Sequence, residues 1–169
     1  MITYESPVGQ LYLARTEVGL IRLGFGNVES VDEFVADVLA RVGDEGGHEH
    51  CFDNIRTALD SYFAYGNEID SITVDWRHIA GFHRRALAAC QLVSIGRTLT
   101  YGQLAERLGS PNACRAVGSA MATNPIPIVL PCHRIVRSDK SLGGYLGGVD
   151  VKAKLIELEF AHSVPAKES

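Results

Sequence analysis

The sequence predicts an α/β (α+β) amino-terminal domain with a small antiparallel sheet, followed by a mostly helical carboxy-terminal domain that contains a helix-turn-helix. Three observations predict it: alternating apolar residues at the start, mainly helical spacing in the second half, and a change between these patterns near residues 75–81. We therefore expect domains at 1–78 and 79–169. A chain of 169 residues that is 46% hydrophobic can bury a sizeable core.

The elements of the first half follow from this alternation and its interruptions. Residues 2–25 alternate and are broken by tight turns, one at Gly19, which is typical of antiparallel hairpins. Residues 31–42 and 52–63 carry apolar side chains at helical spacing and predict two helices. Residues 69–76 alternate again, so we expect a further strand or an extended connector.

The second half begins with three predicted helices, at residues 82–93, 101–108 and 112–123. The last two are short and are separated by a Gly-Ser-Pro turn at 109–111, which is the helix-turn-helix pattern. The second of them would meet DNA, because its small residues allow a close approach. An ordinary packed helical hairpin explains the same pattern equally well.

The charge of the chain is uneven. The net charge is −4, yet residues 97–140 carry six basic side chains against two acidic ones. This excess permits a local phosphate-binding face beside an acidic remainder. No apolar stretch is long enough to span a membrane and no secretory signal is present, so we expect a cytoplasmic protein.

The cysteines do not form a disulfide or metal framework. All four are scattered in unlike contexts, which predicts free thiols: Cys51, Cys90, Cys114 and Cys132. His48, His50 and Cys51 lie close together, but no second ligand pair at zinc-finger spacing follows. We expect a polar loop there and no metal site.

Cys132 has the surroundings of a reactive thiol. Prolines flank the apolar run that precedes it and fix an extended approach, so the cysteine should lie at a strand end or turn. A thiol becomes a nucleophile when a base or cation stabilises the thiolate, and His133 and Arg134 supply both. Because adjacent residues of an extended chain point to opposite faces, Cys132 and His133 can communicate only through a turn or a bridging water.

Seven segments match one protein family, in order along the chain: 6–9 (SPVG), 98–105 (TLTYGQLA), 115–120 (RAVGSA), 124–125 (NP), 131–136 (PCHRIV), 142–148 (LGGYLGG) and 154–159 (KLIELE). On these segments the chain resembles the O6-alkylguanine-DNA alkyltransferases over nearly its whole length. The resemblance implies repair of alkylated DNA, in which an alkyl group passes from O6 of guanine to the protein in a single irreversible turnover.

The resemblance also implies the residues that carry out the transfer. Cys132 corresponds to the alkyl acceptor, His133 to the base that activates it through a water, and Glu159 to the carboxylate that orients the histidine. Asn124 corresponds to a hinge residue that ties backbone groups together. Tyr101 corresponds to the donor to guanine N3, which favours the neutral leaving base.

The substrate by the same resemblance is double-stranded DNA that contains O6-alkylguanine, with O4-alkylthymine as a second candidate. The base must flip out of the duplex to reach the thiol. No cofactor and no membrane partner is implied, and we expect a monomer, with cooperative assembly on DNA left open. Arg115 would fill the gap left by the flipped base. The remaining implied residues contact DNA (Ala116, Ser119, Thr100 and Gln103) or line the base pocket with Tyr101 (Ile135, Tyr145 and Leu146).

The chain departs from the family pattern at five positions. Leu87, Cys90 and Ser94 stand where the family commonly has tryptophan, leucine and proline, which affects the packing of a core helix and its exit. Thr100 stands where serine is common. Leu146 replaces a small or hydroxylated pocket residue, which leaves its backbone N–H available but alters which adducts fit.

Two other functions remain open at this stage. Cys, His and Glu would also suit a cysteine hydrolase, although the sequence indicates no acyl pocket or oxyanion site. A non-catalytic helix-turn-helix protein could recognise alkylated DNA and recruit other repair proteins, but relatives of that kind lack the acceptor cysteine.

Overall fold

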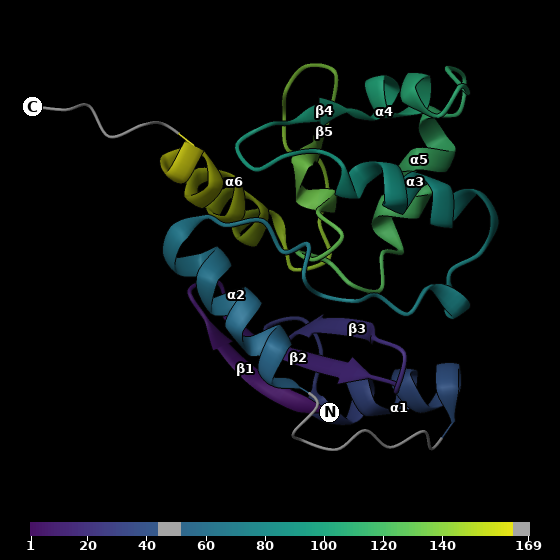
Figure 1. Cartoon of the computed structure of the whole chain (residues 1–169). Coiled ribbons are helices and arrows are strands. Elements are labelled where there is room, and N and C mark those ends of the chain that lie inside the picture. Colours follow the sequence, from purple (N-terminus) through teal and green to yellow (C-terminus); the bar gives the residue numbers. More distant parts are fainter. Residues whose placement is uncertain (44–51, 164–169) are drawn as a thin grey trace, which may run out of the picture.

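The computed structural model describes residues 1–43 and 52–163, and the cluster of His48, His50 and Cys51 lies outside them. Its first element is a three-stranded antiparallel sheet in the order β1-β2-β3 (Figure 1). The strands are β1 (Ile2–Ser6), β2 (Gly9–Arg15) and β3 (Leu20–Phe25), which confirms the predicted hairpins.

Helices cover this sheet on both faces. On one face, α1 (Val31–Val42) buries Phe34 against Tyr12 and Ile21. Ser30 begins α1 with a capping box to Glu33. On the other face, α2 (Asp53–Tyr65) joins the main core and ends at a left-handed Gly66. Both helices were predicted from the spacing of their apolar residues.

The sequence left open whether residues 69–76 form a further strand or an extended connector, and the structure shows an extended connector. Its pairing with the sheet is one parallel bridge between Leu20 and Val74. The buried Asp75 accepts a hydrogen bond from Thr16 Oγ1 at 2.7 Å and precedes the short helix η2 (Trp76–His78). The connector is therefore fixed to the amino-terminal sheet.

The second half is mainly helical, as predicted. α3 (Gly81–Gln91), α4 (Tyr101–Arg107) and α5 (Cys114–Ala122) pack on one another. The sequence analysis omitted two features. A short parallel pair joins β4 (Leu99–Thr100) to β5 (Ile135–Val136), and α6 (Val149–Ser163) closes the described chain beside α2 (Figure 1).

A single hydrophobic cluster extends through both halves. It includes Leu11 of β2, Leu59 of α2, Leu87 of α3, Val117 of α5 and Leu155 of α6. The two-part architecture predicted from the sequence is therefore confirmed, with its parts sharing one core. Among the residues that the structure describes, no helix is long and apolar enough to cross a membrane.

Candidate active site

A short helical turn, η3 (Cys132–Arg134), holds the thiol at the start of β5. Cys132 N–H donates to the Leu130 carbonyl at 2.7 Å, and Arg134 N–H donates to the Pro131 carbonyl at 2.9 Å. Cys132 is thus in a turn, the kind of position that the flanking prolines predicted. Its side chain is buried, because the residue is only 3% exposed.

Asn124 connects the end of α5 to this turn. Its Nδ2 donates to the Leu130 carbonyl at 2.7 Å and to Cys132 Sγ at 3.0 Å, while its Oδ1 accepts from the Ile126 N–H at 3.0 Å. The amide therefore ties three backbone or side-chain groups together. The bond to sulfur stabilises a thiolate, because a donor to a charged acceptor favours the charged form.

The thiol is nevertheless protonated at neutral pH. Burial raises the pKa of Cys132 to about 11, and the Asn124 hydrogen bond and the charge of Lys152 oppose this only in part. A base is required before the sulfur can attack. His133 is the neighbour in sequence that can serve.

His133 is fully buried in the same turn as the thiol and faces Glu159 of α6. Its Nε2 is 2.7 Å from Glu159 Oε1. Because Glu159 is ionised, that nitrogen carries the ring proton and donates, which leaves a lone pair on Nδ1. Nδ1 is buried without a hydrogen-bond partner among the described residues. Burial lowers the pKa of His133, so the ring is a neutral base.

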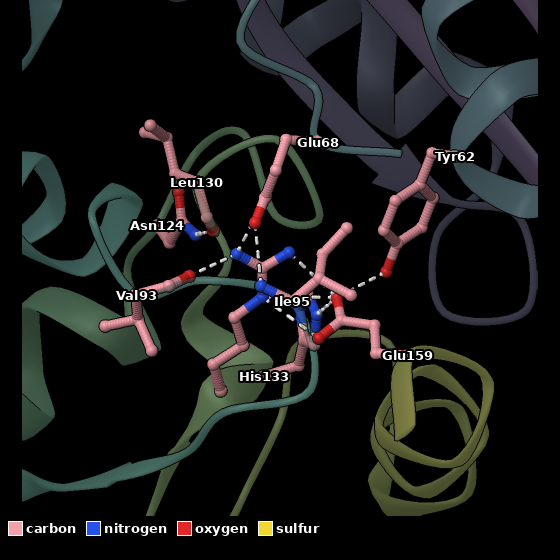
Figure 2. Close-up of polar contacts among 9 residues, drawn as sticks. Tyr62, Glu68, Val93, Ile95, Asn124, Leu130, His133 and Glu159 are labelled. Carbon is pink, nitrogen blue, oxygen red and sulfur yellow. Dashed lines mark hydrogen bonds and ion pairs between the residues drawn. The ribbon is translucent and has the colours of Figure 1, made fainter. Parts of the chain in front are cut away.

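Glu159 is the centre of a buried polar network (Figure 2). Burial opposes ionisation, but hydrogen bonds from His133 and Arg134 and the charge of Arg134 lower its pKa to about 2. Arg134 Nε donates to Glu159 Oε2 at 3.0 Å. Tyr62 Oη donates to Oε1 at 2.7 Å and comes from α2, so the amino-terminal half contributes directly to the site.

Arg134 does not have the place that the sequence analysis gave it. We expected its charge beside the thiol, but its guanidinium binds Glu159, the Val93 carbonyl and, at 3.4 Å, Glu68. Glu68 in turn accepts the Ile95 N–H at 2.7 Å. The physical reason is that a buried arginine needs a buried carboxylate, and Glu159 is the one within reach.

Lys152 supplies the positive charge that acts on Cys132 instead. It is fully buried on α6, and its Nζ donates to the carbonyls of Ile135, at 2.7 Å, and Leu142. Burial lowers the pKa of Lys152, while the nearby Cys132 raises it. The two carbonyls belong to the strand and loop on either side of the turn at 137–141, so Lys152 also fixes the loop that follows.

A cavity of about 350 Å³ leads to the thiol. Tyr101 lines it from the start of α4, and burial raises the pKa of this tyrosine, so its hydroxyl is a donor. Tyr145 forms another wall, its ring edge-on to His133 at 6.2 Å and to Phe25 at 5.7 Å between centroids. The remaining lining residues are Gly118, Met121, Ala122, Gly144 and Leu146.

Of the predicted pocket residues, Ile135, which the resemblance assigned to the pocket through its backbone groups, is not among the residues that line this cavity. Its side chain is buried in the core, and its carbonyl accepts from Lys152. Leu146 lies at the rim and is 36% exposed, so it borders the entrance. Asn27 Nδ2 donates to the Gly147 carbonyl at 3.0 Å and connects this loop to the amino-terminal half.

The predicted DNA-contacting residues lie on α5 and at the start of α4, the helices that also supply Gly118 and Tyr101 to the cavity. Arg115, Ala116 and Ser119 are exposed on one face of α5, while Val117 and Ala120 are buried on the other. Thr100 and Gln103 form a capping box at the start of α4: Gln103 N–H donates to Thr100 Oγ1 at 3.1 Å, and Thr100 N–H donates to Gln103 Oε1 at 2.8 Å. These two side chains therefore have a structural role in the free protein.

Two further thiols lie within the described residues. Cys90 is buried in α3 and Cys114 is exposed at the start of α5; both are free, as predicted. Within the described residues, no three histidine, cysteine, aspartate or glutamate side chains gather as a metal site would require.

Three polar side chains of the site were not predicted: Tyr62, Glu68 and Lys152. Tyr62 lies at helical spacing among apolar neighbours, so the sequence pattern indicated core packing only. Nothing in the local sequence distinguishes Glu68 from a surface carboxylate. Lys152 carried a weak signal, since it lies one heptad before Glu159 on the same helix and shares its face.

Comparison with known proteins places this site in context. Residues 1–75 match the family described as 6-O-methylguanine DNA methyltransferase, ribonuclease-like domain, and residues 81–161 match 6-O-methylguanine DNA methyltransferase, DNA binding domain. A methylated-DNA--protein-cysteine methyltransferase of Mycolicibacterium paratuberculosis is 38% identical over 95% of this chain and 92% of its own. The human protein of that name is 34% identical over 93% of this chain and 78% of its own.

Solved structures agree with these matches. Mycobacterium tuberculosis OGT in complex with DNA superposes with a TM-score of 0.78 and 32% identity, covering 96% of this chain and 94% of that one. The structure of M. tuberculosis O6-methylguanine methyltransferase gives a TM-score of 0.81 at 32% identity, with 97% and 94% coverage.

Proposed function

The chain belongs to the 6-O-methylguanine DNA methyltransferase family, and on this premise we propose that it repairs DNA by moving an alkyl group from O6 of guanine to Cys132. The observation that carries the proposal is that Cys132 lines the 350 Å³ cavity, next in sequence to a buried neutral histidine that Glu159 orients. We assign residues 79–169 to DNA binding and transfer, and residues 1–78 to a supporting domain.

The reaction follows from the protonation states of the site. His133 Nδ1 takes the thiol proton, directly or through a water, and the resulting imidazolium is stabilised by Glu159. The thiolate attacks the alkyl carbon, the carbon–oxygen bond breaks, and the electron pair passes into the guanine ring. A thioether forms on Cys132. Because a thioether does not hydrolyse, each chain reacts once.

The leaving guanine needs a donor as its ring accepts these electrons. The Tyr101 hydroxyl is protonated and faces the same cavity as the thiol, so we propose that it donates to guanine N3. Tyr145 would pack against the base. An O6 atom inside a duplex is out of reach of a buried sulfur, so the nucleotide must be flipped into the cavity.

The exposed face of α5 is the proposed contact with DNA. Its small residues allow the helix to approach the duplex closely, and Arg115 would fill the space left by the flipped base. We propose O6-alkylguanine in double-stranded DNA as the substrate and a monomer as the acting unit. O4-alkylthymine is a second candidate substrate for the same cavity.

Intact-mass spectrometry tests the proposal. The chain is mixed with a duplex that contains one O6-methylguanine, with an undamaged duplex and the Cys132→Ser variant as controls. We expect a gain of one methyl group per chain, mapped to Cys132 and absent from both controls. DNA binding without a mass change would instead favour the recruiting protein, and loss of methyl from more than one equivalent of DNA would favour a hydrolase.

A further inference from the structure

A second cavity, of about 510 Å³, adjoins the one that leads to Cys132. The two share Tyr101, Gly118 and Gly144 in their walls, so they meet at the entrance to the base pocket. Cys132 lines the inner cavity, whereas the outer one is bordered by two guanidinium side chains, those of Arg115 and Arg137. We call the second one the outer cavity.

Arg137 lies directly beside the base pocket. A Cβ atom built on Gly143 would be 3.4 Å from Tyr101 Oη and 3.6 Å from Arg137 Nε, so both side chains border the same glycine. Gly143 has a φ of +71°, which side chains disfavour. The loop is therefore thin at the point where Arg137 and Tyr101 come together.

The backbone around Arg137 is held in a tight turn. Arg137 N–H donates to the Ser141 carbonyl at 3.0 Å, and Lys140 N–H donates to the Arg137 carbonyl at 2.9 Å. Asp139 also borders the outer cavity, but its Oδ1 accepts from Ser141 N–H at 2.9 Å and from Ser141 Oγ at 2.7 Å. This carboxylate stabilises the turn that presents Arg137.

Hydrogen bonds from Ser141 and, to a smaller extent, the charge of Arg137 lower the pKa of Asp139, but neither guanidinium group of the outer cavity is hydrogen-bonded to a carboxylate among the described residues. Arg22, Arg77 and Arg134 each bind a carboxylate, whereas in the part of the chain that the structure describes the Arg137 and Arg115 side chains have no hydrogen bond or ion pair. An arginine fork without a partner, next to a nucleotide-sized pocket, is suited to a phosphate.

We propose that the outer cavity binds a backbone phosphate of the strand that carries the flipped nucleotide, with Arg137 as the phosphate ligand. This inference rests on the proposed function. When the base enters the inner cavity, its sugar and the attached phosphodiester must remain at the shared entrance, within reach of Arg137. Arg115 is then free to enter the duplex.

The test compares a substrate that has a phosphate backbone with one that has none. Single-turnover rates are measured with subsaturating duplex containing O6-methylguanine and with free O6-benzylguanine base, whose benzylic carbon is readily displaced. For Arg137→Ala, we expect the ratio of the duplex rate to the free-base rate to fall on the order of tenfold. The slope of log affinity for duplex against log salt should become shallower by about one.

Lys154→Ala is the matched control, because it removes one exposed positive charge of α6 that borders neither cavity. It should leave the ratio unchanged. Arg137→Lys should keep most of the salt slope. An unchanged ratio in Arg137→Ala, whether both rates stay the same or fall together, would overturn the phosphate assignment. If the unmodified chain reacts with neither substrate, the proposed function itself fails, and the phosphate assignment falls with it.

Discussion

Glu159 has two opposed requirements at the scale of single residues. It must be ionised to stabilise the imidazolium of His133 during transfer, yet it must not draw a proton onto that ring beforehand. Arg134 and Tyr62 meet both requirements, because they donate to the carboxylate and spread its charge. Burial also lowers the pKa of His133. The base therefore stays neutral until the thiol is deprotonated.

Tyr62→Phe tests this balance. Without the hydroxyl, more of the negative charge of Glu159 acts on His133, so the pKa of His133 rises. We expect the acid limb of the pH–rate profile for methyl transfer to move to higher pH by roughly half a unit to one unit. The plateau rate should fall by a few-fold, since Glu159 loses one of its fixed donors. Stopped-time mass spectrometry across a pH series measures both effects.

Tyr4→Phe is the matched control for this variant. Tyr4 also lies in the amino-terminal half and donates to a carboxylate, that of Asp60, at 2.7 Å, but it is far in sequence and function from the thiol. Its removal should change stability without moving the acid limb. If Tyr62→Phe likewise alters only stability, the tyrosine is a packing residue and has no influence on the base.

The sequence identified the reactive residues but not their supporting partners. Cys132 and His133 stand side by side directly after Pro131, so their chemistry could be inferred locally. Tyr62 and Glu159 are 97 positions apart, and their contact depends on how α2 and α6 pack. Arg134 was assigned to the wrong partner for the same reason: a charge next to the thiol in sequence is turned away from it by η3.

Thr100 and Gln103 stabilise the start of a helix, a role that was not predicted from the sequence. Their capping box begins α4, the helix whose first residue is Tyr101. We expect Thr100→Ala to lower the free energy of unfolding by about 1 kcal/mol, because an orphaned helix N–H loses its acceptor. Urea unfolding of the DNA-free protein measures this.

Thr100→Ser separates capping from DNA contact, because serine keeps the hydroxyl and removes only a methyl group. The free energy of unfolding of Thr100→Ser should therefore be nearly that of the unmodified chain. Equal stability of Thr100→Ala and the unmodified chain would mean that the cap contributes nothing and that the threonine serves DNA contact alone.

The helices and the amino-terminal hairpins were predictable because each carries many residues of one period. α1 matches its predicted range, 31–42, from end to end. β4 and β5 have two residues each, too few for any period, and their parallel pairing joins segments far apart in the chain. Short elements of this kind are set by tertiary packing, and the active-site turn η3 directly precedes one of them, β5.

The connection between the two halves is a feature of the whole molecule. The hydrophobic cluster is continuous through the sheet, α2, α3 and α6, and Tyr62 and Asn27 add hydrogen bonds from the first half to the second. The connector is fixed by Asp75, which accepts from Thr16 Oγ1 and from Arg77. Unfolding should therefore be one cooperative transition in which Asp75 takes part.

Asp75→Asn tests this through the dependence of stability on pH. Hydrogen bonds from Arg77 and Thr16 hold the pKa of Asp75 well below its usual range. A depressed pKa in the folded state gives stability that is present above the unfolded value of about 4 and is lost as the pH falls below it. At pH 7 we expect the variant to be less stable by about 1–3 kcal/mol. The difference in stability between the variant and the unmodified chain should narrow towards pH 3, where the unfolded chain already binds a proton at this carboxyl.

Asp70→Asn, at an exposed site, is the control and should change stability by no more than about 0.5 kcal/mol. Urea unfolding at both pH values decides the question: a gap that is the same at pH 7 and pH 3 would mean that the loss comes from altered packing of the connector and not from the charge of Asp75.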